Sequence, residues 1–203
     1  MKLYIANTEF FNEYDKYFQM MSDKRKDSVN RLKFDSAKKQ TVLGEALARK
    51  GLNDLTGIDE DKIIFSRTEN GKPYAENADV FFSISHSKDY VVCAVDDNEI
   101  GVDIEQIRQV ESRITNISCT ERDKKYIFGE ADSETLTPEM LNRFFDVWTA
   151  KEAYFKYIGS GIVGLKTVDY EEIKPQCKKF IECGYIITIY SKQDFHGMKL
   201  KIV

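Results

Sequence analysis

The stretch ISHSKDYVVCAVDDNEIGVDIE (residues 84–105) carries the alternating pattern that decides the fold. VFFSIS and YVVCAV, to either side of a His-Ser-Lys-Asp loop, predict two short apolar strands. After a polar turn, IGVDIE alternates between apolar and other residues, so that Gly101, Asp103 and Glu105 point to one face of a third strand. The stretch therefore predicts adjoining strands, the last of which presents two carboxylates on one face.

Helices and further strands are predicted on both sides of this stretch. KLYIA near the N-terminus predicts a strand, and AKKQTVLGEALARKGL predicts a helix with Ser36 as N-cap and Gly51 as terminator. EMLNRFFDVWTAKEAYFKYIG (139–159) predicts a second helix with apolar residues all around it, which is typical of a buried helix. GYIITIY and MKLKIV are predicted to close the chain as strands. Helix, glycine and then strands thus occur once in each half, which indicates two similar lobes.

The composition narrows the class of protein. The chain of 203 residues is 42% apolar and 32% charged, which is typical of a soluble globular protein with one core or two small lobes. A net charge of -4 argues against nucleic acid as the main partner. The four cysteines lack CxxC spacing and the chain has two histidines, which favours free thiols over disulfides or zinc. Because no signal peptide or membrane-spanning run is apparent, we expect a cytoplasmic protein without a membrane partner.

Acidic residues form the first candidate site. Asp103 and Glu105 share a strand face and repel one another unless a cation intervenes, although an exposed strand end is the simpler explanation for an isolated pair. Glu152 adds a third acid in aromatic surroundings, with Lys156 on the same helix face, and a plain Glu-Lys helix pair is the alternative there. Taken together, three carboxylates and a lysine resemble a magnesium site that faces a phosphate.

A second group of residues suits an anion. His86 lies between Ser85 and Ser87, where small hydroxyl side chains and backbone amides favour phosphate binding. Lys72, in a Gly-Lys-Pro turn, could add a positive charge. The alternatives are a structural hydrogen-bonding histidine and an ordinary surface lysine.

Three motifs in order, FSISHS, IGVDIE and WTAKEAYFKYIGSGI, resemble the signature motifs of the 4′-phosphopantetheinyl transferases, and the Sfp-like monomeric type fits best. The segments NGKPY and TVLGEALAR resemble further parts of that family, so the resemblance runs from about Lys24 to Leu165. It implies an α+β fold, the 4′-phosphopantetheinyl transferase fold, in which two similar α/β lobes form a pseudo-dimer around a cleft for coenzyme A. We expect residues 1–98 to form an N-terminal lobe that contacts the coenzyme A phosphates. Residues 99–203 would form a C-terminal lobe with the magnesium ligands and the signature helix.

The resemblance also implies a role for each candidate residue. The magnesium ligands would be Asp103, Glu105 and Glu152. The contacts to coenzyme A would be Lys72, Ser85, His86, Lys156 and, as a helper, Lys151. The catalytic residues would be Glu152, Lys156 and Glu121. Of these, Glu121 matches a family glutamate and could act as the general base. An exposed glutamate at the start of a helix is the alternative for Glu121.

The family reaction transfers 4′-phosphopantetheine from coenzyme A to a serine of an apo acyl or peptidyl carrier protein. It releases adenosine 3′,5′-bisphosphate and depends on magnesium, as in fatty-acid, polyketide or nonribosomal peptide synthesis. A non-catalytic binding module for coenzyme A or a carrier protein, and a metal-dependent phosphodiesterase or nuclease, are the alternative functions. An intact set of acids together with Lys156 favours the transferase.

This sequence departs from the family pattern in its N-terminal region. Gln40 stands where the family commonly has an arginine, so Arg31, Lys38 and Lys39 are only candidate nucleotide contacts. Because carrier proteins are acidic, a chain with negative net charge needs a local basic docking surface, and residues 24–26 and 122–125 are the candidates.

Overall fold

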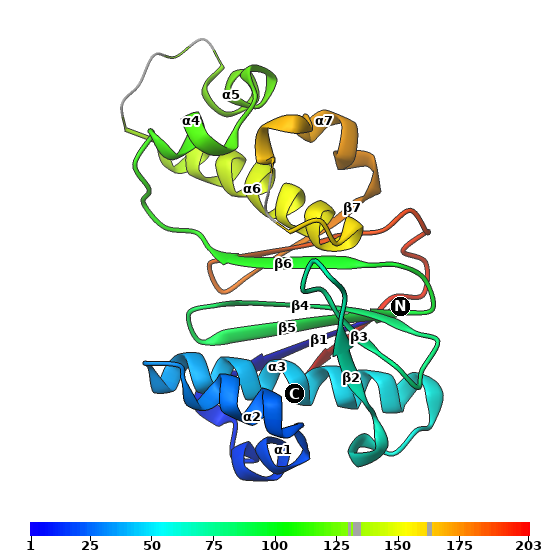
Figure 1. The fold of residues 1–203 in the computed structure, drawn as a ribbon. Helices are drawn as coiled ribbons and strands as arrows, with labels where there is room; N and C mark the ends of the chain where they lie inside the picture. The colour runs from blue at the N-terminus through cyan, green and yellow to red at the C-terminus, as the bar shows by residue number, and fades with distance from the viewer. Residues whose placement is uncertain (130, 132–134, 162–163) are drawn as a thin grey trace.

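The computed structural model describes residues 1–129, 131, 135–161 and 164–203. Two β-sheets lie between two layers of helices (Figure 1). The strands are β1 (Lys2–Asn7), β2 (Phe65–Arg67), β3 (Pro73–Ala75), β4 (Phe81–Ser87), β5 (Tyr90–Asp96), β6 (Gly101–Gln106), β7 (Cys177–Glu182), β8 (Tyr185–Tyr190) and β9 (Lys199–Ile202). The α-helices are α1 (Tyr14–Met20), α2 (Asp23–Asn30), α3 (Asp35–Thr56), α4 (Ile114–Ser118), α5 (Glu121–Phe128), α6 (Pro138–Ile158) and α7 (Tyr170–Ile173). Short 3-10 helices are η1 (Thr8–Phe10), η2 (Glu60–Lys62), η3 (Leu165–Thr167) and η4 (Lys174–Gln176).

The two lobes share one strand order. The sheets run β4-β5-β1-β9 and β7-β8-β6, while β2 and β3 form a separate ribbon. In each lobe a first strand, β1 or β6, precedes a long helix, α3 or α6. A hairpin follows, β4–β5 or β7–β8, whose second strand pairs antiparallel with the first strand. This recurrence confirms the predicted α+β fold of two similar lobes.

The last strand leaves the second lobe. β9 pairs in parallel with β1, so Lys199–Ile202 extend the sheet of the first lobe. We had expected residues 99–203 to form one lobe, but a crossover back to β1 has no local signature in the sequence. Lys201 contributes to the attachment, because its ammonium pairs with Asp54 at the end of α3.

Hydrophobic cores hold the layers together. Between the two sheets lies a core whose members include Leu3, Val92, Val102, Ile104 and Ile187. A second core joins the first sheet to α3, and a third surrounds α6. The apolar faces of both sheets are therefore buried, and each long helix covers the outer face of one sheet (Figure 1).

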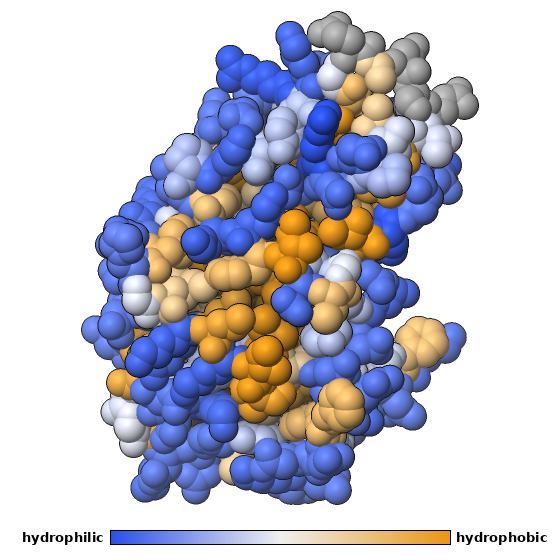
Figure 2. All heavy atoms as spheres, turned by 180° about the vertical axis from the view of Figure 1, so that it is seen from behind, coloured by the Kyte–Doolittle hydropathy of each residue, from blue (hydrophilic) through white to orange (hydrophobic). Residues whose placement is uncertain are grey.

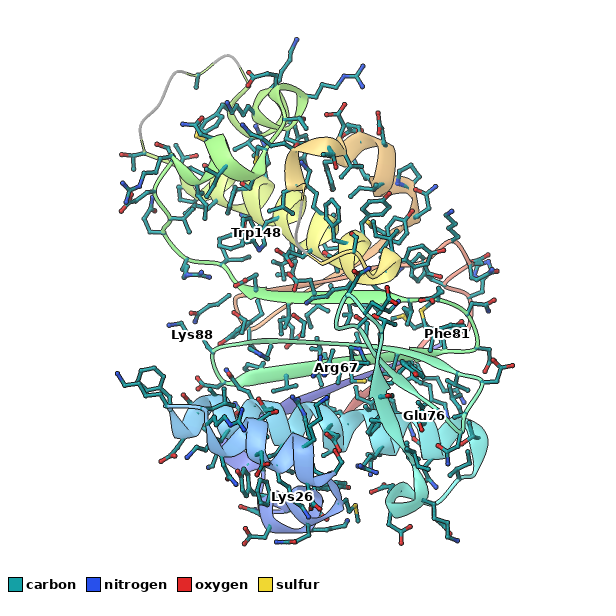
Figure 3. The ribbon with its side chains drawn as sticks, in the orientation of Figure 1. Lys26, Arg67, Glu76, Phe81, Lys88 and Trp148 are labelled. Atoms are coloured by element: carbon teal, nitrogen blue, oxygen red, sulfur yellow. The ribbon has the colours of Figure 1, made fainter. Side chains whose placement is uncertain are left out.

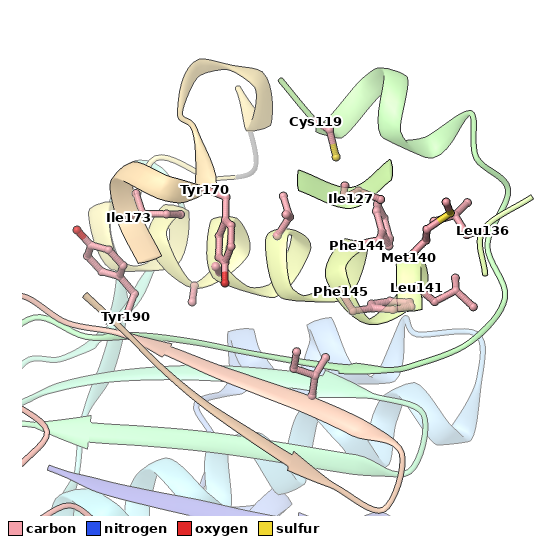
Figure 4. Close-up of a cluster of buried hydrophobic side chains, with 14 residues drawn as sticks. Cys119, Ile127, Leu136, Met140, Leu141, Phe144, Phe145, Tyr170, Ile173 and Tyr190 are labelled. Atoms are coloured by element: carbon pink, nitrogen blue, oxygen red, sulfur yellow. The ribbon is translucent and has the colours of Figure 1, made fainter. Parts of the chain in front are cut away.

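Helix α6 confirms the predicted buried helix over 139–159. It begins after Thr137, whose side chain accepts a hydrogen bond from the Met140 amide at 3.3 Å, and it ends at Gly159, which adopts a left-handed conformation with φ of 69°. The second sheet covers one side of α6, and α5 and α7 pack on other sides (Figure 4). Apolar residues all around the helix follow from this position, because the helix is covered from more than one direction.

Helix α3 differs from the prediction at both ends. Phe34 takes the N-cap position in place of Ser36, and the helix continues through Gly51 to Thr56 before left-handed Gly57 ends it. Gly51 is needed for packing, because a Cβ atom there would lie 2.4 Å from the Val95 side chain. The predicted terminator is thus a contact point between helix and sheet.

The rear face of the molecule carries a gathering of apolar side chains (Figure 2). β7 and β9 are edge strands on this side, and their exposed apolar residues include Ile181, Leu200 and Ile202. In the part of the chain that the structure describes, no helix has the length and apolar character needed to cross a membrane.

Candidate functional site

The candidate site lies at the seam where β4 of the first lobe meets β6 of the second. Ser83, Ser85 and Ser87 occupy alternate positions of β4 and therefore point to one face, toward β6. The Val102 amide donates to the Ser83 hydroxyl at 3.0 Å, and the Gln106 amide donates to the Ser87 hydroxyl at 3.2 Å. The acid-bearing strand is thus held against the Ser-His strand by side-chain hydrogen bonds.

Asp103 is the centre of this seam. Its Oδ1 lies 2.7 Å from the Ser85 hydroxyl and 2.7 Å from the Lys156 ammonium, and Lys156 also lies 2.7 Å from Ser85. Its Oδ2 is the one buried side-chain oxygen or nitrogen without a hydrogen-bond partner among the described residues. An orphaned carboxylate oxygen is costly to bury, so this atom has free capacity for a cation or a donor from a ligand.

Glu152 and Glu105 complete the acidic cluster. The pKa of Glu152 is raised to about 7, mainly by burial and also by the negative charges of Asp103 and Glu105, while Lys156 opposes the rise. Glu105 accepts hydrogen bonds from Ser87 at 3.0 Å and from Arg108 at 3.1 Å. The structure therefore brings the three acids within electrostatic reach of one another and of Lys156.

The donor set fits a hard divalent cation. Carboxylate oxygens are the ligands that magnesium prefers. A cation bound at the free Oδ2 of Asp103 would also relieve the repulsion among the three acids. Across the described ranges, no group of three or more His, Cys, Asp and Glu side chains is already arranged as a metal site. Lys156 is instead the cation that contacts Asp103.

His86 lies on strand β4, where we had predicted a loop. It pairs with Val91 in the β4–β5 hairpin, so the loop shrinks to Lys88 and Asp89. Its side chain is exposed. Loss of hydration and the nearby Lys156 lower the pKa of His86, while Asp103 opposes the shift. The imidazole thus lies within electrostatic reach of Lys156 and Asp103, although Ser85 and His86 occupy successive positions of β4 and point to opposite faces.

A cleft of about 240 Å³ opens between the lobes beside this cluster. It is lined mainly by apolar surface, with Lys72 and Lys156 as its charged residues. Lys72 reaches from the first lobe to the end of α6, where its ammonium pairs with Glu99 and donates to the Tyr157 carbonyl at 2.8 Å. The cleft therefore combines an apolar wall with two cations, which suits a ligand that has both apolar and phosphate parts.

Comparison with known proteins decides the family. Residues 99–196 match the profile of the 4′-phosphopantetheinyl transferase superfamily, and residues 9–98 match the profile of the 4′-phosphopantetheinyl transferase N-terminal domain. The chain belongs to the 4′-phosphopantetheinyl transferase superfamily. The two matches meet between β5 and β6, where the chain passes from one sheet to the other.

Several curated 4′-phosphopantetheinyl transferases are similar to this chain. The enzyme gsp of Aneurinibacillus migulanus is 31% identical over 171 residues, which cover 79% of this chain and 66% of the relative. Sfp of Bacillus subtilis (strain 168) is 28% identical over 154 residues, covering 74% and 65%. HetI of Nostoc sp. is 30% identical over 151 residues, covering 70% and 60%. The chain thus spans 60–66% of the length of these transferases.

Two residues that the family resemblance implies for the site lie away from this cluster. Lys151 is buried inside the second lobe, where its ammonium pairs with Asp123 and donates to the Leu165 carbonyl at 2.7 Å. The side chain of Glu121 is exposed at the start of α5 and pairs with Lys124 at 2.9 Å. The structure therefore does not bring Lys151 or Glu121 to Asp103, and their expected roles stay predictions.

The predicted basic surfaces are partly engaged in ion pairs. In the first run, Arg25 faces Glu45 at 3.7 Å, and in the second run Arg122 pairs with Asp169 at 3.1 Å. Figure 3 shows Lys26 on α2, far from Lys88 at the edge of the seam.

Gln40 donates to the Lys88 carbonyl at 2.6 Å, so this residue ties the start of α3 to the β4–β5 turn.

Sequence reasoning missed several residues that shape the candidate site. Ser83 and Ser87 hold β6, Glu99 pairs with Lys72, and Arg108 pairs with Glu105. The serines carried a usable signal, because Ser83, Ser85 and Ser87 alternate along a strand and so share a face. The Lys72–Glu99 pair had none, because it joins residues 27 apart in the sequence, whereas Arg108 follows Glu105 by only three residues.

Proposed function

We propose that this protein transfers the 4′-phosphopantetheine moiety of coenzyme A to a serine of an apo acyl or peptidyl carrier protein. The observation that carries the proposal is the cluster of Asp103, Glu105, Glu152 and Lys156 beside a cleft between two lobes. Relatives at about 30% identity are named for this activity. Adenosine 3′,5′-bisphosphate would be the second product.

Asp103, Glu105 and Glu152 would hold a magnesium ion against the coenzyme A pyrophosphate. Bound there, magnesium would neutralise charge on the phosphate oxygens during transfer. The free Oδ2 of Asp103 and the mutual repulsion of the three acids support this assignment. Proton loss from Glu152, whose pKa is near 7, would accompany metal binding.

The other residues at the seam would bind and orient the substrate. Lys156 and Lys72 line the cleft and would contact phosphate oxygens, each as a point charge. Ser85 contacts Lys156, His86 lies within electrostatic reach of it, and both would add hydrogen bonds from β4. Because phosphoryl transfer depends mostly on positioning and charge stabilisation, this arrangement supplies what the reaction needs.

The acceptor serine must also lose a proton. Glu121 stays the predicted base, although in this structure it is exposed and paired with Lys124. We further propose that one chain forms the whole cleft and acts as a monomer in the cytoplasm, since both walls of the cleft come from the same chain.

Product analysis tests the proposed function. The protein is incubated with coenzyme A, magnesium and an apo carrier protein, and adenosine 3′,5′-bisphosphate is measured by chromatography. A carrier whose acceptor serine is replaced by alanine is the matched control. We expect bisphosphate only with the intact carrier. Release without a carrier would indicate a phosphodiesterase, and coenzyme A binding without release would indicate a binding module.

A further inference from the structure

The open edge of β6 is covered by serine side chains. β4 and β6 each form the edge of a sheet, and an edge strand presents unpaired amides and carbonyls. Ser83 and Ser87 accept hydrogen bonds from two of these amides, those of Val102 and Gln106. The two lobes are thus joined here through hydroxyl groups.

The two bonds bracket the acids. Val102 directly precedes Asp103, and Gln106 directly follows Glu105. Both bonds connect residues 19 apart in the sequence, so β4 and β6 run alongside each other without a change of register. A slip of one residue would turn the carboxylates to the opposite face, away from Glu152 and Lys156.

Ser87 makes a second contact that depends on the same register. Its hydroxyl, which accepts from the Gln106 amide, also lies 3.0 Å from the Glu105 carboxylate. Ser83 and Ser87 are buried, with 5% and 9% of their surface exposed, so water is poorly placed to replace either hydroxyl. Loss of the Ser83 hydroxyl would leave the buried Val102 amide unpaired, and loss of the Ser87 hydroxyl would do the same to the part-buried Gln106 amide, which destabilises the local arrangement of β6.

We propose that Ser83 and Ser87 are positioning residues that set the register of β6 against β4 and thereby orient Asp103 and Glu105 toward the metal. The assignment of the metal rests on the proposed function, whereas the assignment of the register does not. Residues that orient metal ligands typically change metal affinity when they are removed. Ser83 also lines the cleft, so a direct contact to coenzyme A is the competing explanation for that residue.

The experiment uses the full chain and four variants. Ser83→Ala and Ser87→Ala each remove one hydroxyl, and Ser83→Thr keeps an acceptor at the same place. Ser191→Ala is the matched control, because Ser191 is 1% exposed and its hydroxyl accepts from the Gln193 amide at 3.1 Å, outside the site. Thermal unfolding of each variant establishes that it is folded under the conditions used.

Amide hydrogen exchange, measured by NMR, tests directly whether the two serine hydroxyls hold the amides of β6. We expect the Val102 amide to exchange about tenfold faster in Ser83→Ala, and the Gln106 amide about tenfold faster in Ser87→Ala. Ser83→Thr and Ser191→Ala should leave both amides protected. Unchanged exchange of both amides in the alanine variants would overturn the proposal, whatever activity the protein has.

The affinity for Mn²⁺ in the presence of coenzyme A, measured by electron paramagnetic resonance, tests whether Asp103 and Glu105 are oriented toward the metal. We expect each alanine variant to bind Mn²⁺ on the order of tenfold more weakly, with coenzyme A affinity in EDTA unchanged. Faster exchange with unchanged Mn²⁺ affinity would overturn the positioning role. Weaker coenzyme A binding in EDTA would instead assign Ser83 to the ligand. Absence of Mn²⁺ binding in the unsubstituted protein would count against the proposed function, and the exchange result would still decide the register.

Discussion

Asp103 has one oxygen engaged by Ser85 and Lys156 and one buried oxygen that is free. Asp103→Asn removes the negative charge while keeping the size, so we expect turnover to fall by about 100-fold or more with the fold retained. Asp146→Asn is the matched control, because Asp146 pairs with Lys179 at 2.6 Å outside the site. The measurement is the initial rate of carrier modification across a magnesium titration. Full turnover of Asp103→Asn at saturating magnesium would contradict the metal assignment.

Glu152 makes stability depend on pH in metal-free protein. Its pKa is raised from 4.5 to about 7, so between these values the folded protein holds a proton that the unfolded chain has released. The free energy of unfolding therefore falls as the pH rises through this window, by an amount on the order of 3 kcal/mol. In Glu152→Gln this part of the pH dependence disappears.

The measurement for Glu152 is urea unfolding in EDTA at pH 5 and pH 8. We expect Glu152→Gln to gain stability relative to the unsubstituted protein on going from pH 5 to pH 8. Glu139→Gln, at an exposed position near the start of α6, is the control. An equal difference at both pH values would show that Glu152 is ionised normally in the folded protein.

At the scale of elements, the Lys151–Asp123 pair joins the helices of the second lobe. Asp123 on α5 accepts from the Tyr170 amide at the start of α7, and Lys151 on α6 donates to the Ser118 carbonyl at the end of α4. We expect Lys151→Met to lower stability by about 3 kcal/mol, because it leaves a buried carboxylate unpaired. Lys151→Met/Asp123→Asn should regain much of this loss.

Coenzyme A affinity separates the two roles considered for Lys151. In Lys151→Met that remains folded, isothermal titration should give an unchanged coenzyme A affinity, whereas Lys156→Met that remains folded should bind coenzyme A more weakly. A large loss of coenzyme A affinity in Lys151→Met would restore the role implied by the family resemblance.

Gly101 sets the distance between β6 and α6. A Cβ atom there would lie 1.9 Å from the Ala153 carbonyl oxygen and 2.7 Å from the Tyr157 nitrogen, both in the backbone of α6. We expect Gly101→Ala to destabilise the protein by about 3 kcal/mol, since the helix that carries Glu152 and Lys156 must move. Urea unfolding measures the change. In Gly51→Ala the new methyl meets side-chain atoms of Val95 and Tyr4 rather than backbone, so a larger loss there than in Gly101→Ala would contradict this account.

Local patterns predicted the elements that carry the site. The alternation of IGVDIE placed Asp103 and Glu105 on one face of β6, and the apolar sequence around Glu152 predicted α6. Contacts between distant segments were not predictable in this way. Gly51 continues a helix because α3 packs closely on β5, and Lys151 finds its partner 28 residues away. Tertiary packing overrides the low helix propensity of glycine at Gly51, and the Lys151 contact depends on how distant segments meet.

At the scale of the whole molecule, two lobes with one strand order enclose the cleft. The duplicated plan places an edge strand of each lobe at the seam, and β9 and Lys72 add connections from one lobe to the other. Family motifs in the sequence implied the lobes and the cleft, but the return of β9 to β1 has no motif. The site therefore depends on residues from both lobes.

Intact mass spectrometry of a carrier protein tests the central claim most directly. The protein, coenzyme A and magnesium are incubated with an apo acyl carrier protein, and parallel samples contain EDTA or Asp103→Asn. We predict that the carrier gains one phosphopantetheine unit in the complete reaction and none in the EDTA sample, with the Asp103→Asn sample far behind. A gain that is undiminished in EDTA would contradict the metal-dependent mechanism. No gain with any carrier, despite measurable coenzyme A binding, would contradict the transferase activity itself.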